Sequence, residues 1–206
     1  MESYAGSKPI VVIPFHVPLP EKPLSSVGDS NRILYFGGYQ HPPNADAADR
    51  LVRVILPCVR RHHAAAELDL VGAPTERVEA LAGRAVRVTG HVESVEPYLA
   101  AAGVVAIPIR LGGGMRVKVL ESLAAGKAVV ASSRAVEGLD VKPGRDLLLA
   151  ETDDEFCVAI SALLADEARR LEMGSAARRW AAANFDVDRA VKSYEALYRH
   201  LLEARP

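Results

Sequence analysis

The sequence predicts an α/β fold in which a parallel sheet of about six strands carries helices on both faces, with further helices at the C-terminus. Short apolar runs alternate with stretches whose apolar residues recur at helical spacing, from residue 33 to residue 149. Three of these runs are closed by a glycine, at Gly37, Gly72 and Gly90. Because strands that are separated by helices pair in parallel through right-handed crossovers, one layered sheet is expected.

The expected strands are residues 33–36, 68–71, 85–88, 104–107, 128–131 and 146–149. Helices are expected at 45–61, 76–81, 95–101, 153–165, 168–184 and 187–203, and one more runs from the glycines at 112–114 to Gly126. Four residues of the helix at 45–61 are expected to face the core: Leu51, Val54, Ile55 and Val59. Asp153 is expected to be the N-cap of its helix, and Trp180 to pack in the core.

Composition narrows the class of protein. Half of the 206 residues are hydrophobic, and the formal net charge is −1, which argues against general nucleic-acid binding. No apolar run is long enough to span a membrane, and the first 30 residues lack the pattern of a signal peptide, so a soluble domain is expected. Cys58 and Cys157 are expected to be buried free thiols, which favours a reducing, cytoplasmic setting.

Residues 1–30 are interpreted as a hinge or linker, because they are rich in proline and leave room only for a short strand at 10–13. Residues 31–206 form the expected folded domain. Two adjacent histidines, His62 and His63, point about 100° apart on a helix and cannot chelate one ion together, so C-terminal capping of the helix is expected instead. No metal site is expected.

The stretch from residue 110 to residue 139 organises the chain. Gly112, Gly113 and Gly114 follow an apolar strand and allow a tight turn into a helix. Val119, Leu120, Leu123 and Ala124 share the apolar face of that helix, whereas Lys118, Glu121 and Ser122 share the polar face. Free amides and the positive end of the helix dipole favour an anion at such a turn, and Lys118 adds a cation there. This arrangement predicts phosphate binding, although glycine turns also serve as plain connections.

This stretch resembles the donor-nucleotide loop of retaining GT-B glycosyltransferases of family 4, a large bacterial family that includes mannosyl- and glucosyltransferases. The family carries a Glu-(seven residues)-Glu pair, then Gly-Lys/Arg-Pro-Val-Val and an acidic Glu-Gly. Glu121 matches the second glutamate, which implies a hydrogen bond to the ribose hydroxyls. Gly113 stands in place of the first glutamate, and one branch of the family has a Gly-Gly-Gly-x-Arg-x-Lys run there. The resemblance implies the Rossmann-like donor lobe of a GT-B enzyme.

Further matches follow in order along residues 12–202. They are Gly37-Gly38-Tyr39 with Pro43-Asn44, Gly90-His91-Val92, and Glu137-Gly138-Leu139. Each follows a predicted strand, where ligands of open parallel sheets bind. The segment Val12 to Val17 resembles the crossing between the two lobes. The resemblance therefore implies that the acceptor-binding lobe is missing from this chain and is supplied by the full-length protein or by a separate subunit.

The donor-binding residues are assigned from this combination. The backbone amides of Gly114, Met115, Arg116 and Val117, with the Lys118 ammonium, are expected to hold the diphosphate of a UDP- or GDP-type nucleotide sugar without a metal. The family also uses the loop after the first strand, where Gly37 and Gly38 stand here. His91 and Val92 match the turn that holds the base, although His91 is equally interpretable as a surface residue. No catalytic nucleophile is identified.

The sequence leaves one alternative function open and argues against another. A non-catalytic module that binds a nucleotide or docks on another chain remains open as the alternative to the glycosyltransferase lobe. An NAD-dependent oxidoreductase would need Gly-x-Gly-x-x-Gly after the first strand, and the chain lacks the third glycine beyond Gly37 and Gly38. The expected location is cytoplasmic, or peripheral to a membrane in the full-length enzyme.

Overall fold

A computed structural model describes residues 11, 13, 17–24, 31–112, 114–185 and 187–203. It contains a six-stranded sheet in the order β3-β2-β1-β4-β5-β6, and all five strand pairs are parallel. The strands are β1 (Arg32–Phe36), β2 (Glu67–Val71), β3 (Val86–Val88), β4 (Val104–Ile107), β5 (Val129–Ala131) and β6 (Leu148–Leu149). The predicted α/β fold is confirmed. The strand order reverses between β1 and β4, which places a ligand-binding crevice at their carboxyl ends.

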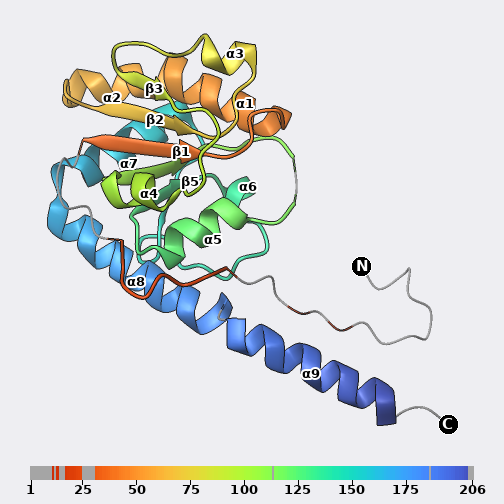
Figure 1. Cartoon of the computed structure of the whole chain (residues 1–206). Coiled ribbons are helices and arrows are strands. Elements are labelled where there is room, and N and C mark those ends of the chain that lie inside the picture. The colour runs from red at the N-terminus through yellow and green to blue at the C-terminus, as the bar shows by residue number, and fades with distance from the viewer. Residues whose placement is uncertain are drawn as a thin grey trace.

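The helices are α1 (Pro42–Arg50), the π-helical segment η2 (Leu51–Ile55), α2 (Leu56–His62), α3 (Glu76–Glu79), α4 (Glu96–Ala101), α5 (Val117–Ala124), α6 (Ser133–Val136), α7 (Asp153–Ala165), α8 (Glu167–Phe185) and α9 (Val187–Glu203). Helix α7 packs on α2 and η2, whereas α5 packs on α8. Figure 1 shows the sheet between these groups, with α9 running out from the body. None of the helices in the described ranges is long and apolar enough to cross a membrane.

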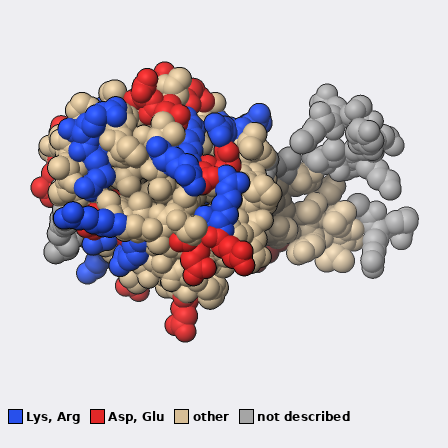
Figure 2. All heavy atoms as spheres, turned by 90° about the horizontal axis from the view of Figure 1, so that it is seen from above, with Lys and Arg blue, Asp and Glu red and all other residues tan. Residues whose placement is uncertain are grey.

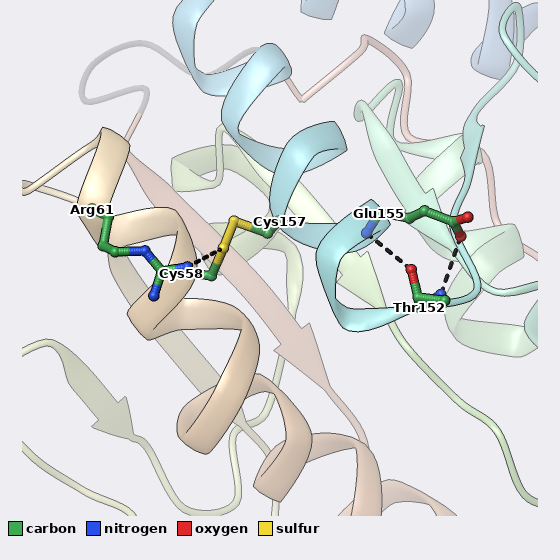
Figure 3. Close-up of a disulfide and its surroundings, with 5 residues drawn as sticks. All are labelled: Cys58, Arg61, Thr152, Glu155 and Cys157. Atoms are coloured by element: carbon green, nitrogen blue, oxygen red, sulfur yellow. Dashed lines mark hydrogen bonds between the residues drawn. A yellow bond between two sulfur atoms is a disulfide. The ribbon is translucent and has the colours of Figure 1, made fainter.

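Three local expectations need correction. Val54 is 47% exposed, because η2 puts wider π-helical turns into the expected helix and rotates this residue away from the core. The N-cap of α7 is Thr152 rather than Asp153, and Thr152 forms a capping box with Glu155 (Figure 3). Ser122 is buried rather than on the polar face. Its burial is possible because its hydroxyl donates a hydrogen bond to the carbonyl of Lys118 at 2.6 Å and so has a partner other than water.

Helix α8 crosses the end of α5 with backbone against backbone. A Cβ atom at Gly174 would lie 2.0 Å from the carbonyl oxygen of Gly126, so only glycine allows this approach. Arg178 of α8 donates to the carbonyl of Ala124 at 2.8 Å and also binds that of Pro20 in the N-terminal segment. Trp180 is buried as expected, and its Nε1 donates to the carbonyl of Asp140 at 2.7 Å. These contacts fix the C-terminal end of α5 against α8.

Arg50, on the helix that follows β1, binds loops that follow strands of the other half of the sheet. These contacts lie at the carboxyl ends of the strands. This guanidinium is 7% exposed, and it donates to the carbonyl oxygens of Pro108 at 3.0 Å and Glu151 at 2.7 Å. It also pairs with Asp153 at the start of α7. Because Pro108 directly follows β4, this network holds the loop that leads to the glycine turn.

The prediction of free thiols is wrong. Cys58 of α2 and Cys157 of α7 form a disulfide with a Cα–Cα distance of 5.8 Å (Figure 3). Both lie in helices, as expected, but the packing of α2 on α7 brings them together across 99 residues of sequence. The argument for a reducing, cytoplasmic setting rested on free thiols and therefore loses its support.

Candidate functional site

A cleft opens at the carboxyl ends of β1 and β4. Its volume is about 270 Å³. Its walls come from the end of β1 and the turn into α1, from the loop after β4, and from the first turns of α5. The lining residues are Phe36, Gly37, His41, Pro43, Asn44, Ile107, Ile109, Leu111, Gly112, Met115, Arg116, Val117, Lys118, Val119, Glu121 and Ala135. Sequence segments that lie far apart thus meet at the predicted place.

Lys118 is the cation of this cleft. Its ammonium donates to Oδ1 of Asn44 and to the hydroxyl of Tyr35 at 3.4 Å, and it lies 5.0 Å from the centre of the Tyr35 ring. Burial lowers the pKa of Lys118 to about 8, against the opposing influence of the Glu121 carboxylate. At neutral pH most of the ammonium groups remain charged, in a position that is largely shielded from water.

The N-terminus of α5 faces the same cleft. Arg116 is its N-cap residue, and no side chain caps the helix there. The first backbone hydrogen bond runs from the amide of Leu120 to the carbonyl of Arg116, at 3.0 Å. The amides of Val117, Lys118 and Val119 therefore precede the first intrahelical bond, which is where a helix binds an anion.

Two glycines allow these segments to come together. A Cβ atom at Gly37 would lie 3.1 Å from Nδ2 of Asn44 and 3.3 Å from Nζ of Lys118. Gly112, with φ of +84°, packs on α1, where a Cβ atom would lie 2.8 Å from Cγ of Pro43. The glycine turn thus packs closely on the start of α1, and the Lys118 side chain lies next to the backbone of Gly37.

Glu121 lies between the cleft and a second hollow. It is half-buried and lines both, and burial raises the pKa of its carboxyl group. The second hollow has a volume of about 250 Å³. Its other lining residues come from the N-terminal segment, from residues 93–99 and from the end of α5: Pro18, Pro20, Leu24, Glu93, Ser94, Val95, Glu96, Leu99 and Ala125.

Several predicted site residues lie elsewhere than expected. Helix α5 begins at Val117, so Gly114 and Met115 precede it and Arg116 only caps it. Arg116 lines the cleft, and its guanidinium pairs with the Glu137 carboxylate at 3.0 Å. His91 is exposed and is absent from the lining of the cleft.

The remaining predictions fall on loop residues. Val92 packs partly against the core. Gly38 is exposed, and its carbonyl accepts a hydrogen bond from Asn44 at 2.9 Å. Gly113 and the expected strand at 10–13, apart from residues 11 and 13, lie outside the described residues. His62 ends α2 and His63 is its C-cap, as expected. Within the described residues, no three His, Cys, Asp or Glu side chains are grouped as metal ligands.

Sequence reasoning missed the partners of Lys118. Tyr35 lies in an apolar strand and gave no sign of a role beyond packing. In the sequence, Asn44 is only part of a family match with Pro43. The pair of Arg110 and Asp46, joined by two hydrogen bonds of 2.8 Å at the rim, was also missed. Arg110 holds the pKa of the Asp46 carboxyl group below its usual value.

Comparison with known families shows which family the chain belongs to. The family model described as "Glycosyl transferases group 1" matches residues 30–166. The chain belongs to the group 1 glycosyl transferases. The resemblance to the C-terminal lobe of a GT-B glycosyltransferase is therefore confirmed. A comparison with curated proteins gives no match.

Solved structures share the fold of this glycosyl transferase chain. Sucrose-phosphate synthase from Thermosynechococcus elongatus is 23% identical, with a TM-score of 0.75, over 94% of this chain and 53% of that one. HepE from Anabaena, in complex with UDP and glucose, is 16% identical, with a TM-score of 0.68, over 84% of this chain and 48% of that one. This chain thus spans about half the length of these two proteins.

A third structure is itself a single domain. The C-terminal domain of a group 1 glycosyl transferase family protein from Francisella tularensis is 11% identical, with a TM-score of 0.61. The alignment covers 76% of this chain and 86% of that domain. The described fold is therefore similar to the fold of that single domain.

Proposed function

We propose that this chain is the donor-binding lobe of a retaining glycosyltransferase. It binds a UDP- or GDP-type nucleotide sugar, and the sugar passes to an acceptor that is held by a second lobe. The retaining outcome rests on the resemblance to family 4. Family membership and the chemistry of the cleft both support this proposal over the alternative of a non-catalytic binding module.

The observation that carries the proposal is the meeting of Lys118 with the uncapped N-terminus of α5 in one cleft. Glycosyl transfer from a nucleotide sugar releases a diphosphate, and negative charge develops on it as the bond to the sugar breaks. A fixed cation and amides that already point at this position stabilise that charge without reorganising. The assignment of the diphosphate to Val117 and Lys118 therefore needs no metal ion.

The position of Glu121 supports the rest of the donor's placement. With the diphosphate at Lys118, the ribose reaches Glu121 one turn further along α5, where the carboxylate accepts hydrogen bonds from its hydroxyls. The base then lies toward the second hollow, whose wall includes Glu93, directly after His91 and Val92. In this placement His91 and Val92 contribute through the backbone of their turn.

The acceptor-binding lobe is proposed as the partner of this chain. HepE and sucrose-phosphate synthase are about twice as long as the aligned part of this chain. Helix α9 carries a stripe of large apolar residues that are 38–67% exposed: Val187, Val191, Tyr194, Tyr198, Leu201 and Leu202. Its charged residues have both signs, which favours a protein surface over an anionic membrane as the cover of this stripe.

The test is calorimetry of the purified chain with UDP, GDP and NAD in the presence of a chelator. At least one nucleoside diphosphate should bind, weakly, because an interlobe site has only half of its contacts here. NAD should bind more weakly or not at all. If NAD binds more tightly than both UDP and GDP, the proposed function is wrong.

A further inference from the structure

We infer that Asn44 is a positioning residue: it holds the Lys118 ammonium in the cleft with a neutral acceptor, so that the positive charge stays available to an anionic diphosphate. This inference rests on the proposed function for the identity of the anion. It concerns a residue that touches the cation and the loop after β1, and to which the proposed donor placement gives no role.

The orientation of the Asn44 amide follows from its neighbours. Its Nδ2 donates to the carbonyl oxygen of Gly38 at 2.9 Å, which turns Oδ1 toward the interior of the cleft. There Oδ1 accepts one hydrogen bond from the Tyr35 hydroxyl at 3.1 Å and another from the Lys118 ammonium. A flipped amide would set an N–H group against two donors, so only one orientation satisfies all three contacts.

Tyr35 is the third member of this hydrogen-bond network. Its side chain is fully buried on β1, and burial raises the pKa of its phenol well above the usual value, so the hydroxyl remains a donor at neutral pH. Because this hydroxyl donates its hydrogen bond to Asn44, its oxygen lone pairs are left to accept a hydrogen bond from Lys118 at 3.4 Å. The hydrogen-bond directions are therefore consistent around the whole network.

Both groups that accept hydrogen bonds from the ammonium, Oδ1 of Asn44 and the hydroxyl of Tyr35, are neutral. Two nearby carboxylates are paired with arginines instead: Asp46 with Arg110, and Glu137 with Arg116. Three other charged or titratable groups line the cleft with Lys118: His41 from the turn into α1, Arg116 at the start of α5 and Glu121 from α5 itself. Glu121 raises the pKa of Lys118, but burial outweighs it.

This choice of residue matters because aspartate has nearly the same shape as asparagine. A carboxylate at position 44 would form an ion pair with Lys118 and would neutralise the charge that the diphosphate needs. The partly buried ammonium is thus held in place by hydrogen bonds to neutral groups, and within the described residues it forms no ion pair. An anionic ligand gains the full interaction with it, and gains more than it would in water.

The experiment compares Asn44→Asp and Asn44→Ala with a matched control, Gln40→Glu. Gln40 is exposed in the same loop and is absent from the cleft lining, so the control adds the same charge without contacting Lys118. The Lys118 side chain is titrated by NMR with isotope-labelled lysine and is assigned with Lys118→Gln. Binding of UDP and of uridine is measured by calorimetry, and circular dichroism checks the fold.

In Asn44→Asp the pKa of Lys118 should rise by about one unit or more, because an opposite charge now contacts it. UDP binding should weaken about tenfold or more, since a charge-assisted contact is lost, while uridine binding should change less than about twofold. Asn44→Ala should lower the pKa of Lys118, because an acceptor of the charged form is removed. Gln40→Glu should leave that pKa and the UDP affinity near the wild-type values.

An unchanged pKa of Lys118 in both Asn44 variants would overturn the inference, as would equal weakening of UDP and uridine by Asn44→Asp. The two proposals fail differently. If the wild-type chain does not bind UDP or GDP at all, the proposed function is lost, whereas the lysine titration still decides whether Asn44 positions the ammonium.

Discussion

At the scale of single residues, Lys118 is a charged side chain in a largely buried position. Its pKa of about 8 means that the ammonium titrates just above neutral pH, because burial disfavours the charged form. A bound diphosphate would stabilise that charged form. Binding and protonation are therefore linked at this residue, which gives the proposed site a pH dependence of known direction.

UDP affinity should fall as the pH rises through 8. Between pH 7 and pH 9 the charged fraction of a group with this pKa drops about tenfold, so the affinity should fall by up to about tenfold. The terminal phosphate of UDP is already ionised over this range, since its pKa is about 6. Calorimetry at several pH values checks this, and Lys118→Ala should show a flat profile. A flat profile in the wild type would contradict the assigned role.

Part of the site could be predicted from the sequence at this scale. The spacing of Lys118 and Glu121 from the glycines was sufficient, because residues within one turn of a helix have fixed relative positions. The ion pair of Arg116 could not be predicted in this way, because its partner Glu137 comes from a loop 21 residues away. Contacts such as those of Asn44 with Gly38, Tyr35 and Lys118 depend on how the glycine turn packs on α1, which local spacing does not encode.

At the level of elements, the disulfide joins two helices that the sequence separates widely. Cys58 is in α2 and Cys157 in α7, which lie on the same face of the sheet. The guanidinium of Arg61 lies 3.1 Å from Sγ of Cys58 (Figure 3). The bounds of α7 were predicted to the residue, whereas α2 is the last part of the single helix expected at 45–61. Which helix packs on which follows from the strand order. That order is set by tertiary packing.

Reduction of this disulfide should lower the free energy of unfolding by about 2–4 kcal/mol, because the unfolded chain gains the freedom of a long loop. Urea unfolding with and without a reductant measures the change. The double variant Cys58→Ser with Cys157→Ser serves as the control and should unfold identically under both conditions. If the wild-type midpoint were insensitive to reductant, the two helices would not be held by this bond.

On the scale of the whole molecule, the surface carries charges of both signs and one helix extends from the body. Figure 2 shows lysine and arginine side chains interspersed with aspartate and glutamate on the face seen from above, as a net charge of −1 leads one to expect. Figure 1 shows α9 extending beyond the body of the sheet. The overall layering was predicted well, because alternating strands and helices permit few arrangements. The exposed stripe of α9 was not predicted, because amphipathic spacing does not reveal what covers a helix.

The isolated chain should transfer no sugar and should at most hydrolyse a nucleotide sugar slowly. The reason is that the proposed acceptor site lies on a second lobe, and transfer requires both substrates in one closed site. An assay with donor and candidate acceptors checks this, with donor hydrolysis followed in parallel. Robust transfer by the pure chain of 206 residues would refute the proposed division of labour.

The central claim is that the diphosphate lies at Lys118 and the start of α5. The most direct measurement is the binding of UDP and of uridine, or of GDP and guanosine if those bind more tightly, to Lys118→Ala and Glu121→Ala. Lys118→Ala should weaken the nucleoside diphosphate by about 1–3 kcal/mol, the range for a hydrogen bond to a charged group, and should hardly affect the nucleoside. Glu121→Ala should weaken both ligands similarly, because each retains the ribose. If Lys118→Ala weakens nucleoside and nucleoside diphosphate equally while circular dichroism shows an intact fold, the diphosphate does not bind there.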